Sequence, residues 1–99
     1  MPPSTASTHV FVSFRVHGDV QGVGYRRYAV REAQSLDLAG WVRNEPDGSV
    51  SGEAEGPEAS LETFRARLAQ GPAFATVSRL DWNHPGVRSS LPHPFVIRR

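Results

Sequence analysis

The nine residues from Gly18 to Arg26, GDVQGVGYR, contain three glycines and end in an arginine. Glycines at three of these positions permit positive φ and close backbone approach, so consecutive N–H groups can turn toward one concavity that attracts oxyanions. A helix-like run follows and adds the positive end of its macrodipole. The guanidinium of Arg26 can bind two phosphate oxygens at once. The stretch therefore predicts a phosphoryl-binding loop, although a glycine-rich turn with a surface arginine fits the same residues equally well.

Composition limits the classes to which the protein can belong. The chain has 99 residues, room for one small domain, and its 11 arginines against 10 acidic residues give a net charge of +1. Such a balance implies no strong attraction to nucleic acid or to a membrane. The absence of cysteine excludes disulfides, thiolate metal sites and cysteine nucleophiles. No apolar run approaches the length of a membrane span or signal peptide. We expect a cytoplasmic monomer.

The first half of the chain reads as a tail, a strand and a helix. Residues 1–8 are small and polar with two prolines, and we expect a flexible tail there. Apolar residues alternate over 9–17, which is the period of a half-buried strand. From Tyr25 to about Leu36 the apolar residues recur at helical spacing. The remaining residues, 9–99, are expected to form a single domain.

The second half adds two hairpin strands, a helix and two further strands. Turn residues at 45–48 separate a strand over 38–44 from an alternating run that begins at Val50. Gly56-Pro57 and Gly71-Pro72 bracket the second helix. A strand over 75–83 follows, with Val77 and Leu80 out of phase, so we expect a bulge or an edge position. A proline-rich loop then leads to a short final strand over 95–98.

This order, β-α-β-β-α-β with an extra short strand, is the ferredoxin-like split βαβ arrangement of the α+β class, with two helices on one face of a mostly antiparallel sheet. In this arrangement the first two strands run parallel and the third fits between them. Their carboxyl ends therefore emerge at one edge of the sheet. We expect the loop after the first strand to meet Asn44, which ends the second.

Two separated signatures resemble the acylphosphatases. The first is Gly18-Asp19-Val20-Gln21-Gly22-Val23-Gly24-Tyr25-Arg26, and the second is Gly40-Trp41-Val42-Arg43-Asn44, continued by Gly48, Val50, Gly52 and Gly56. The resemblance extends over nearly the whole chain, including its length and the closing Phe95-Val96-Ile97. It implies that Arg26 is the phosphate-binding catalytic arginine and that Asn44 orients the attacking water. Asp19 departs from the family, which often has a basic residue there, and we expect its carboxylate to point away from the loop.

The resemblance implies metal-independent hydrolysis of an acyl phosphate to a carboxylate and inorganic phosphate, with no cofactor. Such a substrate suits a chain with few candidate acids and bases, because a carboxylate of pKa about 4 leaves without a protonating group. Inorganic phosphate is expected to bind as product and inhibitor. The substrate met in the cell is not predicted.

Metal binding, RNA binding and phosphate binding without catalysis are the alternatives to an enzymatic function. The four histidines lack the spacing of a metal site, and a structural role at a strand end is favoured for His17. Arginines on a ferredoxin-like sheet could suggest RNA, yet the aromatic stacking signature of that class is missing. Two alternatives stay open: a module that binds carbamoyl phosphate within a larger machine, and a non-catalytic phosphate-binding or regulatory domain of the same fold.

Overall fold

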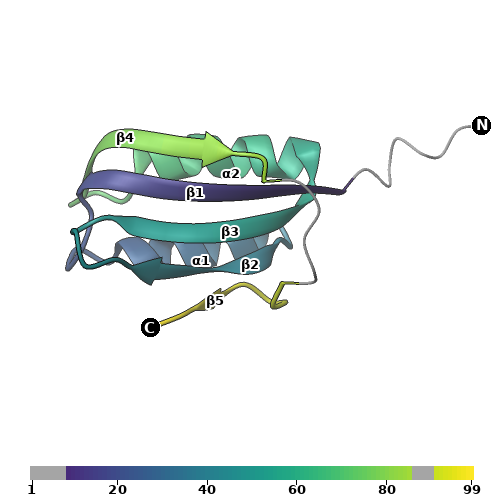
Figure 1. Cartoon of the computed structure of the whole chain (residues 1–99), viewed down its shortest axis with the longest axis horizontal. Coiled ribbons are helices and arrows are strands. Elements are labelled where there is room, and N and C mark those ends of the chain that lie inside the picture. The colour runs from purple at the N-terminus through teal and green to yellow at the C-terminus, as the bar shows by residue number, and fades with distance from the viewer. Residues whose placement is uncertain (1–8, 86–90) are drawn as a thin grey trace, which may run out of the picture.

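A five-stranded sheet with two helices on one face forms from residues 9–85 and 91–99, the parts of the chain that the computed structural model describes (Figure 1). The elements follow in the order β1 (His9–Asp19), α1 (Tyr25–Ser35), β2 (Ala39–Asn44), β3 (Val50–Pro57), α2 (Glu58–Gln70), β4 (Thr76–Asn83) and β5 (Val96–Ile97). The predicted ferredoxin-like α+β fold is confirmed. Neither helix in the described ranges is long and apolar enough to cross a membrane.

The order of the strands across the sheet is β4-β1-β3-β2-β5. β3 pairs antiparallel with both β1 and β2, so β1 and β2 point the same way, and β5 pairs parallel with β2. The carboxyl ends of β1 and β2, Asp19 and Asn44, therefore lie at one edge of the sheet. The loop from β1 to α1 leaves from the same edge.

The core lies between the sheet and the two helices. Alternation along β1 directs Val12, Phe14 and Val16 inward, where all three are buried. Each helix contributes three buried residues at helical spacing: Tyr25, Ala29 and Ala33 from α1, and Leu61, Phe64 and Leu68 from α2. The ring of Phe64 meets the rings of Phe14 and Phe95 edge to face, at centroid distances of 5.8 and 5.7 Å.

The irregularity predicted for the fourth strand is present, and β4 is an edge strand as well. His17 pairs with Arg79 but Gly18 pairs with Val77, so Ser78 is the extra residue of a bulge. This extra residue lets both Val77 and Leu80 pack against the core. The same pairing carries β1 through Asp19, two residues beyond the predicted strand. The expected tail over 1–8, and residues 86–90 of the proline-rich loop, lie outside the described residues.

Candidate active site

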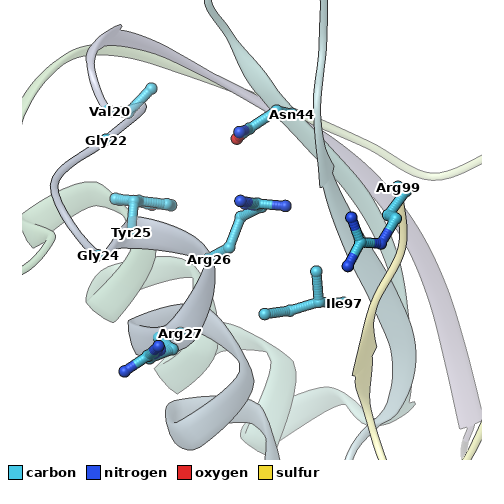
Figure 2. Close-up of a pocket in the computed structure, with 9 residues that line it drawn as sticks. All are labelled: Val20, Gly22, Gly24, Tyr25, Arg26, Arg27, Asn44, Ile97 and Arg99. Atoms are coloured by element: carbon cyan, nitrogen blue, oxygen red, sulfur yellow. The ribbon is translucent and has the colours of Figure 1, made fainter.

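A cavity of about 590 Å³ lies at the edge where β1 and β2 end (Figure 2). Its wall comes from the loop after β1, the first turn of α1, the end of β2 and the segment at β5. The residues that line it are Val20, Gly22, Gly24, Tyr25, Arg26, Arg27, Asn44, Ile97 and Arg99. The cavity thus brings together the two signatures that are far apart in the sequence.

Two glycines shape the loop side of this cavity. Gly22 and Gly24 have φ of 76° and 80°, which disfavour other residues, and a Cβ on either would meet no heavy atom within 4 Å. Gly24 is the N-cap of α1, and its carbonyl accepts the first helical hydrogen bond from the N–H of Tyr28 at 3.0 Å. No acidic residue occupies the first turn. The positive end of the helix therefore faces the cavity with no carboxylate from that turn beside it.

Arg26 and Asn44 both point into the cavity, from α1 and from the end of β2 (Figure 2). Across the described ranges, Arg26 forms no ion pair, so its guanidinium is available to an anion. The side-chain oxygen of Asn44 is buried and accepts no hydrogen bond from the described residues. Buried polar atoms are nearly always hydrogen-bonded, so this oxygen calls for a donor within the cavity.

Gln21 fastens the loop to the turn that follows Asn44. Its side-chain nitrogen donates hydrogen bonds to the carbonyl oxygens of Glu45, at 2.8 Å, and Ser49, at 2.9 Å. These bonds use both donors of one carboxamide. The sequence analysis predicted only that Gln21 belongs to the phosphate-binding loop. No local pattern indicates hydrogen-bond acceptors 24 and 28 residues away.

Four residues of the predicted phosphate-binding loop do not line the cavity: Gly18, Asp19, Gln21 and Val23. Gly18 has another role, because a Cβ there would lie 2.1 Å from the carbonyl oxygen of Thr76 in β4. The Asp19 side chain is exposed. His17, next to this loop, pairs instead with Asp81 at 3.0 Å, in keeping with the structural role favoured for it.

Three lining residues were not predicted from the sequence. Ile97 and Arg99 come from the end of the chain, and their position depends on the parallel pairing of β5 with β2. No local pattern encodes that pairing. Arg27 is exposed at the rim of the cavity, with its side chain directed away from Asn44 (Figure 2).

The turn after Asn44 is held by a carboxylate. Ser51 and Arg43 both donate hydrogen bonds to the Glu45 carboxylate, the latter at 2.8 Å. These two hydrogen bonds lower the pKa of Glu45, and the bond from Ser51 has the larger effect.

On the opposite wall of the cavity, burial raises the pKa of Tyr25, whose hydroxyl donates a hydrogen bond to the Leu68 carbonyl at 2.6 Å. Both groups therefore keep their ordinary charge states at neutral pH.

Comparison with known proteins agrees with this arrangement. The family model described as Acylphosphatase matches residues 12–97. The acylphosphatase of Mesorhizobium japonicum is 49% identical over 81 residues, covering 76% of this chain and 86% of its own, and that of Nitratidesulfovibrio vulgaris is 45% identical over 87 residues, 87% of each. The crystal structure of acylphosphatase from Bacillus subtilis superposes with a TM-score of 0.83 at 34% identity, covering 91% of this chain and 99% of that one. The chain therefore belongs to the acylphosphatase family.

Proposed function

We propose that the protein hydrolyses acyl phosphates, and that the reaction takes place in the cavity between the Gly18–Arg26 loop and the end of β2. Membership of the acylphosphatase family supports the reaction class. The observation that carries the assignment of the site is that two side chains face each other across one cavity: the Arg26 guanidinium, which forms no ion pair with the described residues, and the Asn44 oxygen, which is buried and accepts no hydrogen bond from them.

Arg26 and the amides at the start of α1 are proposed to hold the phosphoryl group. Backbone N–H groups around Gly22 and Gly24, together with the helix N-terminus, supply donors at fixed positions. The guanidinium adds two donors and a full positive charge. Charge on the equatorial oxygens of the transition state is thereby stabilised by groups that need no reorganisation.

Asn44 is proposed to position the attacking water. Its side-chain oxygen can accept a hydrogen bond from the water, and this bond directs a lone pair of the water oxygen toward phosphorus. The water oxygen forms a bond to phosphorus while the bond from phosphorus to the acyl oxygen breaks, and the electron pair leaves with the carboxylate. The protons of the water end on phosphate and in solvent. Since a carboxylate leaves readily, the site needs no general acid.

Release of inorganic phosphate from benzoyl phosphate tests this proposal. We expect turnover that persists with a chelator present and that inorganic phosphate inhibits competitively. A folded sample, verified by circular dichroism, that binds phosphate without releasing it from benzoyl phosphate would favour a non-catalytic phosphate-binding domain. Loss of turnover on chelation, restored by a divalent cation, would contradict the metal-free mechanism.

A further inference from the structure

We infer that Arg99 is a specificity-determining residue that favours acyl phosphates carrying a second anionic group on the acyl chain. This inference rests on the proposed function, because it concerns the part of the substrate that the phosphoryl-binding groups leave free. It starts from the charge of the cavity: three of its nine lining residues are arginines and none is acidic.

The register of β5 places Arg99 beside the predicted reaction site. Trp41 pairs with Val96 and Val42 with Ile97 in the parallel ladder, and the N–H of Arg98 donates to the Val42 carbonyl at 2.8 Å. Continuing this register brings Arg99 next to Asn44. Side chains alternate along a strand, so Ile97 and Arg99 lie on the face that carries Val42 and Asn44.

Arg98 takes the opposite face. Its guanidinium lies 5.1 Å from the centre of the Trp41 ring, outside the cavity. Figure 2 shows the Arg99 guanidinium reaching from the β5 side toward Arg26, with the Ile97 side chain below the space that separates the two. Arg99 forms no ion pair with any residue of the described ranges. Two consecutive arginines thus have separate environments.

These positions define a substrate with three parts. The phosphoryl group binds at Arg26 and the loop, a short carbon chain lies against the apolar Ile97, and a carboxylate or phosphate at the far end of the chain meets Arg99. A guanidinium binds either anion in the same fork geometry. The half acyl phosphate of a short dicarboxylic acid is the simplest molecule of this kind.

Succinyl phosphate and butyryl phosphate form a matched pair of probes, because they have the same chain length and differ in the terminal carboxylate. For the unmodified protein we expect kcat/KM to favour succinyl phosphate by about fivefold, the size that one exposed ion pair permits. Arg99→Met should bring this ratio close to one, and Arg99→Lys should keep part of it. The preference should also shrink in about 1 M salt, where charges are screened within about 3 Å.

Arg98→Met is the control, since it removes the neighbouring guanidinium from the other face and should leave the ratio at its original value. Monomethyl succinyl phosphate, which has no terminal charge, should behave like butyryl phosphate. An equal rate for the charged and uncharged probes, or a ratio unchanged in Arg99→Met, would overturn the role of Arg99 while hydrolysis itself stands. Failure to hydrolyse either probe would instead overturn the proposed function.

Discussion

The side-chain nitrogen of Gln21 lies 2.8 Å from the carbonyl oxygen of Glu45, so the predicted phosphate-binding loop is hydrogen-bonded to the residue directly after Asn44. A second bond of 2.9 Å reaches Ser49 at the other end of the same turn. One side chain thus fixes the separation between the amides that would hold the phosphoryl group and the carboxamide that would hold the water.

We predict that Gln21→Met lowers kcat for benzoyl phosphate by about tenfold or more, because misplacement of reacting groups by about 1 Å can cost about 100-fold. The free energy of unfolding should fall by only about 1 to 2 kcal/mol, the net contribution of two neutral hydrogen bonds. Tyr28→Phe is a matched control: it removes the 2.7 Å bond from the Tyr28 hydroxyl to the Arg67 carbonyl, away from the cavity. A kcat that stays at its original value in Gln21→Met would show that the bonds serve stability alone.

Substitution of Arg26 should weaken both phosphate binding and turnover, whereas substitution of Asn44 should lower turnover alone. Arg26→Ala should lower kcat/KM by about 1,000-fold or more and weaken inhibition by inorganic phosphate, because it removes the charged donor to the phosphoryl oxygens. Asn44→Ala should lower kcat by about 100-fold while the inhibition constant of phosphate changes little. Steady-state kinetics with benzoyl phosphate and titration with phosphate measure both quantities.

Two exposed residues provide controls of the same type. Arg31 lies on α1 with 72% of its side chain exposed, and Asn83 is exposed on β4. Arg31→Ala and Asn83→Ala should keep the original kinetics. If Asn44→Ala turned over benzoyl phosphate normally, the water-positioning role would be lost, whatever the result for Arg26.

The sequence was most informative where the residue type itself imposes the geometry. Alternation in β1, the proline and glycine brackets of α2 and the glycines of the loop each restrict the backbone locally, so the order of elements could be predicted, and with it the meeting of Arg26 and Asn44. The bulge in β4 was also visible, because Val77 and Leu80 cannot share a face of a regular strand.

The features of the site that could not be predicted depend on contacts between residues that are distant in the sequence. The acceptors of Gln21 are carbonyl oxygens, which every residue has, so no side-chain pattern indicates them. Similarly, Arg99 reaches the cavity only through the parallel register of a two-residue strand against β2. Gly18 was predicted to help bind the phosphoryl group because glycine permits positive φ, whereas the structure places it against the backbone of β4.

Gly18→Ala should therefore be a strongly destabilising substitution. A Cβ there would lie 2.1 Å from the Thr76 carbonyl oxygen and 2.8 Å from the Ser78 amide nitrogen, and its φ of 127° is strained for alanine. We expect the free energy of unfolding to fall by about 3 kcal/mol or more, which places the change among the large effects of point substitutions.

Gly48 serves as the comparison for this prediction. It also has a positive φ, of 93°, but a Cβ there would meet nothing within 4 Å, so Gly48→Ala tests backbone strain without a clash. Its cost should be about 1 to 2 kcal/mol. Urea denaturation measures both variants, and equal losses would show that contact with β4 does not restrict position 18.

Glu45 should contribute to the loss of stability in acid. Hydrogen bonds from Ser51 and Arg43 lower the pKa of Glu45 in the folded protein, so its stabilising contribution is complete above the unfolded value of about 4.3 and is lost as the pH falls through the lower folded value. In Glu45→Gln the free energy of unfolding should therefore fall less steeply between about pH 5 and pH 2 than in the unmodified protein. Urea denaturation across this range measures the slope.

The control for this titration is Glu62, which has 56% of its side chain exposed and a 4.0 Å ion pair with Arg65. Glu62→Gln removes one carboxylate without disturbing the turn after Asn44, and its acid slope is the reference with which that of Glu45→Gln is compared. Asp47 and Asp81, whose pKa values are lowered chiefly by hydrogen bonds from Ser49 and His17, contribute to the slope in all three proteins. If Glu45→Gln lost stability in acid as steeply as Glu62→Gln, the bonds from Ser51 and Arg43 would not distinguish the charged from the neutral form of Glu45.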